Sequence, residues 1–224
     1  MIAKLEEIME KLKTVTIKQL GRYPVYLRFL LNQRAEGYKT TSAPIIAKGL
    51  GFNEEKVRKD LQVVATSSGK PKSGRNIDDI INDIETFLGY NDTNDAIVVG
   101  TGHLGQAFLN YHGFEDYGLN ILVGFDIDPK VVDTEVNGKR IYSIYKMENL
   151  IPRLNVHIAI LTVPSEVAQE IVDKLVNVGI KAIWNFVPVH LDVPDDVVVE
   201  NVNLASSLAV LSHKLKDKEI NKKI

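Results

Sequence analysis

The feature that most constrains the fold is a run of apolar, largely β-branched residues that ends in three glycines. Residues 96–99 read Ala-Ile-Val-Val, and Gly100, Gly102 and Gly105 follow with G-x-G-x-x-G spacing. This spacing is typical of a first strand that passes into a first helix where backbone N–H groups contact a pyrophosphate. Three glycines also occur in ordinary strand-to-helix turns. The second indication is Asp126, which ends another apolar run 21 residues after Gly105, where a dinucleotide-binding fold carries its ribose-binding carboxylate.

The absence of a Cβ atom gives each glycine of this loop a separate function. We expect Gly100 to make the tight turn, Gly102 to let the main chain approach the phosphates, and Gly105 to let the helix close onto the strand. The Asp126 carboxylate would accept hydrogen bonds from an adenosine ribose and repel the additional phosphate of NADP. The expected cofactor is therefore NAD, as NADH or NAD+.

From residue 91 onward, apolar strands alternate with helical segments. Continuous β-branched runs joined by helical crossovers predict a parallel sheet covered on both faces, and hence an α/β fold with a Rossmann domain over residues 91–202. The strands are expected at 96–99, 121–125, 140–142, 156–163, 182–186 and 197–202, with helices at 103–112 and 165–178. A leucine stripe predicts a last helix within 203–224, which packs either on its own sheet or on a second copy of the chain. The stripe consists of Leu204, Leu208, Leu211 and Leu215.

Ligands of such a sheet bind outside the carboxyl ends of its strands, which identifies the candidate cofactor residues. They are Gly100, Thr101, Gly102, His103, Leu104, Gly105, Asp126, Asp128, Thr162, Val163, Pro164, Asn185 and Phe186. Asp128 precedes Pro129 and is expected mainly to shape the following turn. Pro164 and Pro188 either end their strands or border a surface that faces the nicotinamide.

A helix-turn-helix pattern precedes this domain. Ser42 caps a short helix, which is expected to end at Gly49 and Gly51. Asn53 then caps a second helix that carries basic residues. A short helix, a glycine turn and a basic helix in this order are typical of DNA-binding domains.

The positive charge of the chain is concentrated around this pattern. Residues 40–77 contain seven basic and three acidic residues, although the whole chain has a net charge of −2. The turn-rich segment 65–76 carries only positive charges and is predicted to form a β-wing. Lysine and arginine can simply solvate a helix and a loop, but together with the helix-turn-helix spacing they favour DNA binding. The candidate DNA-binding residues are Ser42, Lys56, Arg58, Lys59, Lys70, Lys72 and Arg75.

The remaining N-terminal segments are predicted to be helices of one DNA-binding domain over residues 1–90. An amphipathic helix is expected within residues 1–20, a second begins at Pro24, and a linking helix over 78–88 ends at Gly89. The polar stretch 91–95 is the predicted domain boundary. The stripe of the first helix consists of Leu5, Ile8, Met9 and Leu12.

Composition excludes several classes of function. The nearly balanced charge excludes a uniformly basic nucleic-acid binder. The absence of cysteine excludes disulfides, thiolate catalysis and Cys-ligated metals, which suits a cytoplasmic protein, and we expect no metal site. No apolar run reaches membrane-spanning length, so we expect no membrane association.

Two other uses of the nucleotide fold stay open at this point. A dehydrogenase needs an acid–base group beside the nicotinamide, and His190 is the histidine nearest the ligand edge. No Arg or Lys accompanies it between Lys181 and Lys214, so a protein that senses NAD fits better than an NAD-dependent oxidoreductase. The third possibility is another adenine-containing ligand, such as a CoA derivative.

The sequence resembles the Rex family of redox-sensing transcriptional repressors. The similarity runs in uninterrupted order from about residue 20 to residue 215 and includes the glycine loop. The other matching motifs are Val-Arg-Lys-Asp-Leu at 57–61, Asn-Tyr-His-Gly-Phe at 110–114, Phe-Asp-Ile-Asp-Pro at 125–129, Ile-Leu-Thr-Val-Pro at 160–164, Gly-Ile-Lys-Ala-Ile at 179–183, Asn-Phe-Val-Pro at 185–188, Val-Pro at 193–194 and Glu-Asn-Val-Asn-Leu at 200–204.

The resemblance implies a homodimer with N-terminal winged helices and C-terminal Rossmann domains, whose last helices swap between subunits. It implies binding to AT-rich palindromic operators of genes for NADH-consuming metabolism, with release when NADH binds and weak competition by NAD+. Arg58 and Lys59 fall on the recognition helix. Arg28 and Tyr111 fall on a switch in which an acidic residue at the start of the last helix pairs with either of them.

The sequence departs from the family at two places. The acidic position of the switch is Asn203, which can hydrogen-bond Arg28 or Tyr111 without an ion pair, or can cap the last helix. The wing lacks the family's aromatic, Phe-Gly-rich sequence and instead carries serine, glycine and lysine over 67–75. We expect operator preference to differ accordingly.

Overall fold

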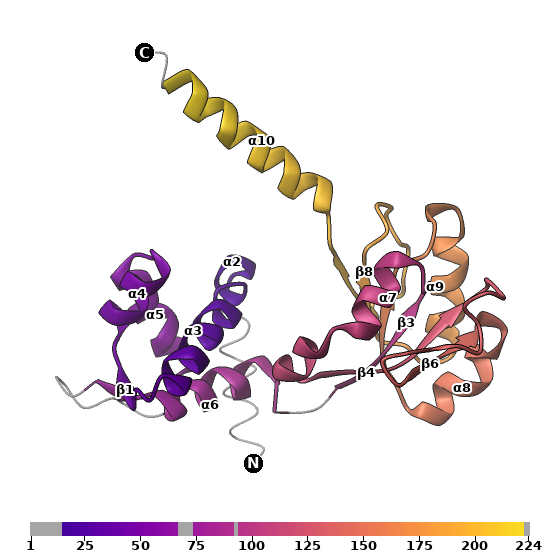
Figure 1. Cartoon of the computed structure of the whole chain (residues 1–224), viewed down its shortest axis with the longest axis horizontal. Coiled ribbons are helices and arrows are strands. Elements are labelled where there is room, and N and C mark those ends of the chain that lie inside the picture. Colours follow the sequence, from indigo (N-terminus) through magenta and orange to yellow (C-terminus); the bar gives the residue numbers. More distant parts are fainter. Residues whose placement is uncertain (1–14, 67–73, 92–93, 222–224) are drawn as a thin grey trace. The chain divides into compact units, whose positions relative to one another are not determined.

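The computed structural model describes residues 15–66, 74–91 and 94–221 (Figure 1). The chain divides into two compact units, Met1–Asp92 and Thr93–Ile224. Each unit has its own buried core, so each is described by itself.

The N-terminal unit is a winged helix. Its helices are α2 (Ile17–Leu20), α3 (Tyr23–Ala35), α4 (Ala43–Leu50), α5 (Glu54–Val64) and α6 (Ile77–Leu88). Strands β1 (Thr40–Thr41) and β2 (Arg75–Asn76) pair antiparallel, with β2 following the wing segment. Fully buried Tyr23, Leu30, Ile46, Val57 and Ile80 come from four of the helices and form one core.

Most of the helix ends predicted from capping residues, glycine and proline are confirmed. The Asn53 side chain accepts a hydrogen bond from the Lys56 N–H at 3.1 Å, and Gly51 ends α4 with a φ of 68°. Pro24 lies in the first turn of α3. The amphipathic helix expected around Leu5 and Leu12 falls outside the described residues.

Two expectations for α4 were wrong. The Ser42 side chain makes no capping hydrogen bond to any residue that the structure describes, although Ser42 does precede the helix. Gly49 lies inside α4 rather than ending it, and a Cβ atom there would overlap the ring of Phe29 in α3. The glycine therefore allows close packing of α4 on α3.

The C-terminal unit is built on a seven-stranded sheet with the order β5-β6-β4-β3-β7-β8-β9. Every neighbouring pair is parallel except β5 with β6. If the six parallel strands are numbered in chain order, their spatial order is 3-2-1-4-5-6, the Rossmann order. The strands are β3 (Asn94–Val99), β4 (Leu119–Asp126), β5 (Glu135–Val136), β6 (Lys139–Ser143), β7 (Ile158–Leu161), β8 (Ala182–Asn185) and β9 (Val198–Asn201).

Helices cover both faces of this sheet. One face packs α8 (Met147–Leu154) and α9 (Ala168–Asn177) over Val99, Phe125 and Leu161. The other face carries α7 (His103–Asn110) and the 3-10 helix η1 (His112–Tyr117) over Val98 and Ile160. Helix α8 was not predicted from the sequence, because it is short and contains a proline.

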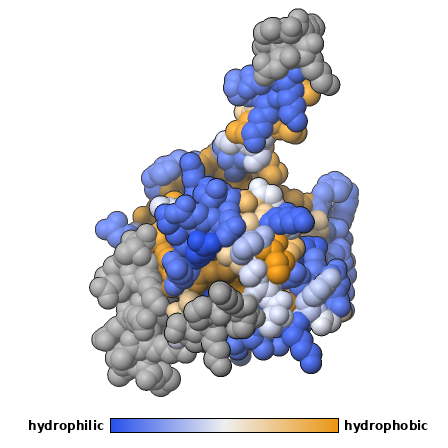
Figure 2. All heavy atoms as spheres, turned by 90° about the vertical axis from the view of Figure 1, so that its left-hand side faces the viewer, coloured by the Kyte–Doolittle hydropathy of each residue, from blue (hydrophilic) through white to orange (hydrophobic). Residues whose placement is uncertain are grey.

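The last helix, α10 (Leu204–Asn221), exposes its apolar stripe. Its four leucines are between 58% and 66% exposed, and Figure 2 shows apolar residues at the surface of this helix, at the top of the view. A monomer rarely leaves such a stripe uncovered. Among the described helices, none is long and apolar enough to cross a bilayer.

Candidate nucleotide and DNA sites

The glycine loop and the end of β7 meet at the topological switch point of the sheet. Gly100 has a φ of 88°, and a Cβ atom there would lie 2.7 Å from the Thr162 carbonyl oxygen. The Thr162 hydroxyl donates to the Gly100 carbonyl at 2.6 Å, and the Thr162 N–H donates to the Val99 carbonyl at 2.9 Å. Thr162 therefore holds the glycine loop in place at the crevice where such sheets bind ligands.

Gly102 and Gly105 differ in what surrounds them. A Cβ atom at Gly105 would overlap the Gly100 carbonyl oxygen, whereas a Cβ atom at Gly102 would meet nothing within 4 Å among the described residues. Gly102 precedes the first residue of α7, where backbone N–H groups point out of the helix. Gly105 therefore serves packing, and Gly102 leaves open space where an anion can approach the positive end of α7.

The Asp126 carboxylate is fixed to the glycine loop. Its Oδ2 atom accepts hydrogen bonds from the Thr101 N–H and, at 2.9 Å, from the Thr101 hydroxyl. Its Oδ1 atom accepts from the Asp128 N–H at 2.9 Å. Asp126 is half-buried, and a carboxylate has about four acceptor positions, so one is left for a ribose hydroxyl. Thr101, which is fully buried, positions this carboxylate.

Two other candidate residues, Asp128 and Asn185, have structural partners. The Asp128 carboxylate accepts the Lys130 N–H at 2.9 Å, which is the turn role expected from the sequence. The buried Asn185 amide donates to Asn201 Oδ1 at 2.7 Å and accepts from the Val187 N–H at 2.9 Å. Both residues hold turns at the ligand edge of the sheet.

The remaining candidates differ in exposure. Phe186 packs its ring 4.7 Å from that of Phe108, on the α7 side of the sheet. His103, Leu104 and Pro164 are exposed, and Val163 is half-buried beside the glycine loop.

Two exposed apolar residues near the strand end at Asp126 were not predicted from the sequence as part of the site. Ile127 follows Asp126 and is 66% exposed, and Tyr145 lies just after β6 and is 80% exposed. Because Asp126 pairs in register with Ser143, both lie at the carboxyl ends of adjacent strands. Exposed apolar side chains there suit the flat face of an adenine. The signal for Ile127 was an apolar residue directly after the acidic one.

The DNA-facing candidates lie on α5. Lys56, Arg58 and Lys59 are exposed, Arg58 pairs with Glu54, and Lys59 pairs with Glu55 at 3.0 Å. Exposed pairs of this kind contribute little free energy, so a phosphate can replace the carboxylates. Lys70 and Lys72 fall outside the described residues.

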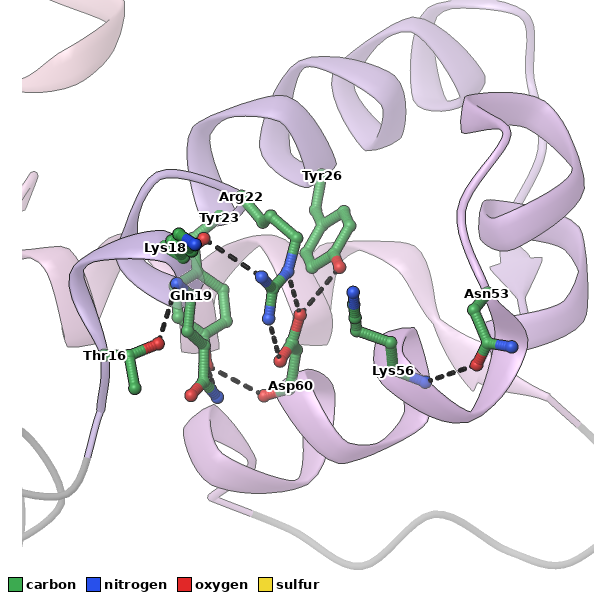
Figure 3. A network of polar contacts seen from close by, with 9 residues as sticks. All are labelled: Thr16, Lys18, Gln19, Arg22, Tyr23, Tyr26, Asn53, Lys56 and Asp60. Atoms are coloured by element: carbon green, nitrogen blue, oxygen red, sulfur yellow. Dashed lines mark hydrogen bonds and ion pairs between the residues drawn. The ribbon is translucent and has the colours of Figure 1, made fainter.

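A buried carboxylate joins α5 to the start of α3. Asp60 is 2% exposed, and Arg22 donates to its two oxygens at 2.6 and 2.8 Å, while the Tyr26 hydroxyl donates at 2.7 Å. The Tyr23 hydroxyl donates to the Asp60 carbonyl at 3.0 Å. Figure 3 shows these side chains converging on Asp60. The network fixes α5 against α3.

The tyrosines of this network remain hydrogen-bond donors at neutral pH. Burial raises the pKa of Tyr23 to about 12. Burial and then the hydrogen bond to Asp60 raise the pKa of Tyr26, and the hydrogen bond to Asp60 raises the pKa of Arg22. Arg22 therefore stays charged and both phenols stay protonated.

A second buried carboxylate, Asp83 of α6, holds both sides of the wing. Arg75 donates to its Oδ2 atom at 2.5 Å, and the Thr66 hydroxyl donates to its Oδ1 atom. These two residues flank the segment 67–73. Arg75 was predicted as a phosphate contact, but its guanidinium here anchors β2 to α6.

The three candidate switch residues lie on different elements. Arg28 is exposed on α3, and Tyr111 follows α7 with its ring 4.8 Å from that of Phe114. The Asn203 side chain accepts a hydrogen bond from the Ser206 N–H at 2.9 Å. Of its two expected roles, Asn203 therefore performs the capping of α10. Its pairing with Arg28 or Tyr111 stays a prediction.

His190 has the environment of a surface residue. Its side chain is 87% exposed, and its Nε2 atom lies 3.4 Å from an oxygen of the equally exposed Asp192. A dehydrogenase acid–base would lie in a cleft beside the nicotinamide. The geometry does not favour the oxidoreductase alternative.

The sequence matches two family models. One is described as a putative DNA-binding protein N-terminus and covers residues 15–62. The other is described as a CoA binding domain and covers residues 91–189. The two matches lie in the two units of the fold.

Similar proteins span nearly the whole chain. Redox-sensing transcriptional repressor Rex of Thermoanaerobacter sp. is 36% identical over 216 residues, which is 96% of each chain. The Rex protein of Porphyromonas gingivalis is 38% identical over 88% of this chain and 90% of its own.

Solved structures of RSP, described as a Rex-family repressor, are also similar. The structure of RSP with beta-NAD+ and operator DNA is 35% identical, covers 93% of this chain and 96% of its own, and has a TM-score of 0.84. The structure with beta-NADH is also 35% identical, covers 93% of this chain and 98% of its own, and has a TM-score of 0.81.

Proposed function

The chain belongs to the Rex family of redox-sensing transcriptional repressors, and we propose that its two units divide the function of that family. The N-terminal unit binds operator DNA, and the C-terminal unit binds NADH or NAD+. Binding of NADH releases the protein from the operator, so the chain is a regulator and not an enzyme. The observation that carries this function is the Asp126 carboxylate held on an open G-x-G-x-x-G loop, in a chain with an exposed basic helix α5.

The nucleotide lies across the switch point between β3 and β7. Its pyrophosphate contacts the N-terminus of α7 beside Gly102, and its adenosine ribose donates to Asp126. The adenine stacks near Ile127 and Tyr145, and the nicotinamide faces the segment after β7 at Val163. The negative charge of Asp126 disfavours the additional phosphate of NADP.

Binding to an operator in the presence of nucleotides tests this function. We expect the protein to bind AT-rich palindromes from its own promoter region and NADH to weaken that binding by about tenfold or more, the usual range of coupling between two sites. NADPH and CoA should have no such effect. The measurement is fluorescence anisotropy of labelled DNA, with calorimetric titration of each nucleotide. Operator binding that is indifferent to NADH would contradict the function.

The protein acts as a homodimer on a palindromic site. Support comes from the exposed leucine stripe of α10 and from the α7 side of the sheet, where Phe108, Trp184 and Phe186 are only partly buried. A helix from a second copy would cover both kinds of apolar surface and would give the two-fold symmetry that a palindrome requires. We place this activity in the cytoplasm, where a bacterial operator is accessible.

Charged substitutions on α10 test the dimer. We expect Leu208→Asp combined with Leu211→Asp to produce monomers in sedimentation experiments, because the carboxylates would be buried in the interface. Operator affinity should fall by about tenfold or more since two half-sites are no longer linked, whereas NADH affinity should persist. Ser212→Asp, at an exposed polar position of α10, is the control. A stable dimer of the double variant would exclude this interface.

A further inference from the structure

A groove of about 480 Å³ lies between α2 and the recognition helix α5. Its lining includes Gln19 of α2, Arg22 just before α3, and Asn53, Glu55, Lys56, Lys59 and Asp60 from α5 and its cap. Lys56 and Lys59 are three positions apart and therefore share one side of α5. Figure 3 shows Gln19, Arg22, Lys56 and Asp60 around this groove.

Of the three positively charged side chains that line the groove, one has no carboxylate partner among the described residues. Arg22 is neutralised by its two hydrogen bonds to Asp60, and Lys59 pairs with Glu55 at 3.0 Å. Among the carboxylates that the structure describes, none lies within 4.0 Å of the Lys56 ammonium. Lys56 is therefore the cation that can hold an anion there without first losing a carboxylate partner.

Neutral donors accompany this ammonium. Gln19 donates one amide N–H to the Tyr23 hydroxyl at 3.2 Å and has a second N–H left. Asn53 uses its oxygen to cap α5, so its amide nitrogen remains a donor. An ammonium and two amides together match the oxygens of a phosphodiester.

We propose that this groove takes one phosphate of the DNA backbone beside the recognition helix, which makes α2 part of the DNA interface. The inference rests on the proposed function. A DNA phosphate fits better than a free anion because the groove includes the exposed Lys59, whose surface pair with Glu55 a phosphate of the same duplex can replace. One net positive charge in an open groove holds a small anion weakly, whereas a phosphate tethered to a duplex gains from every other contact.

The salt dependence of DNA binding tests the groove through two variants. In Gln19→Glu a new carboxylate would add a negative charge to the lining of the groove, and in Lys56→Gln the ammonium is absent. Each should lower the slope of log affinity against log salt by about 0.9, the value for one phosphate. Each should also weaken operator and random-sequence DNA equally, by about tenfold, because a phosphate contact carries no sequence information. The double variant should bind no worse than the weaker single variant, since both lose the same phosphate.

Controls separate the groove from general effects of charge and folding. Asn82→Asp makes the same charge change at an exposed position of α6 and should leave the slope unchanged. NADH affinity and the melting temperature should equal those of the wild type, and Lys56→Gln, at an exposed position, keeps the test valid if Gln19→Glu does not fold.

Four results would overturn the proposal. The first is a wild-type slope in both variants, and the second is weakening of binding by Asn82→Asp equal to that by Gln19→Glu. The third is a relaxed sequence preference of Lys56→Gln at a constant slope. The fourth is tight binding of inorganic phosphate that leaves DNA affinity unchanged. In each case wild-type operator binding is measured in parallel. If the wild type itself fails to bind operator DNA, the proposed function fails, and the groove proposal fails with it.

Discussion

Replacing Gly102 by valine is expected to abolish the response to NADH while both units stay folded. A Cβ atom at Gly102 meets nothing within 4 Å among the described residues, and its φ of −65° is open to any residue. The valine would instead occupy the space in which the pyrophosphate approaches the N-terminus of α7. Loss of two or more charge-assisted hydrogen bonds predicts NADH affinity lower by at least about a hundredfold.

The measurement combines NADH calorimetry, thermal unfolding and operator binding. The Gly102→Val protein should melt like the wild type and should remain on operator DNA at NADH concentrations that release the wild type. Gly105→Ala is the matched control, because a Cβ there would overlap the Gly100 carbonyl oxygen and force the loop to move. This control should lose both stability and NADH affinity. Normal NADH binding by Gly102→Val would show that the glycine loop is not part of the nucleotide site.

Replacing Asp60 by alanine is expected to unfold the DNA-binding unit or to destabilise it severely. The change leaves Arg22 charged in a largely buried position and removes the acceptor of the Tyr26 hydroxyl. Loss of one partner from a buried ion pair typically costs about 3–5 kcal/mol, a large part of the stability of a small domain. Operator binding should disappear, whereas NADH binding should persist because the C-terminal unit has its own core.

Urea unfolding, followed by circular dichroism, measures this effect. Arg34→Ala is the comparison, since it removes an exposed ion pair to Asp78 at 3.5 Å and should cost less than about 1 kcal/mol. If Asp60→Ala were no more destabilising than Arg34→Ala, the Arg22–Asp60 pair would not hold α5 in place.

The local part of the fold was predictable from the sequence. The cap at Asn53, the left-handed Gly51 and Gly89 and the strand that leads into Gly100 each depend on residues within one turn. Asp126 was predictable because the spacing from the glycine loop is set by one strand–helix–strand unit. Three strands were predicted too long, as in 156–163 against Ile158–Leu161, because apolar residues continue into the loops. The other three were predicted too short, as in 121–125 against Leu119–Asp126, because polar residues such as Asn120 also pair in the sheet.

Roles that depend on distant partners were not predictable. Asp60 read as one more charge on a basic helix, but its partner Arg22 lies 38 positions away. Arg75 read as a phosphate contact, but packing of β2 on α6 gives it Asp83. Gly49 was predicted to end a helix. Its actual role could not be predicted, because it depends on the packing of α4 on α3, which brings Phe29 against it.

The sequence by itself therefore determined the two-part organisation, the glycine loop, its acidic partner and the basic helix. These features follow from backbone geometry and from short-range spacing, which the order of residues specifies directly. Only the tertiary structure decided which charged groups are free to contact a ligand. A buried charge needs an opposite charge beside it, so Arg22 and Arg75 pair with Asp60 and Asp83 within the fold, whereas the exposed Lys56 has no carboxylate within 4.0 Å among the described residues.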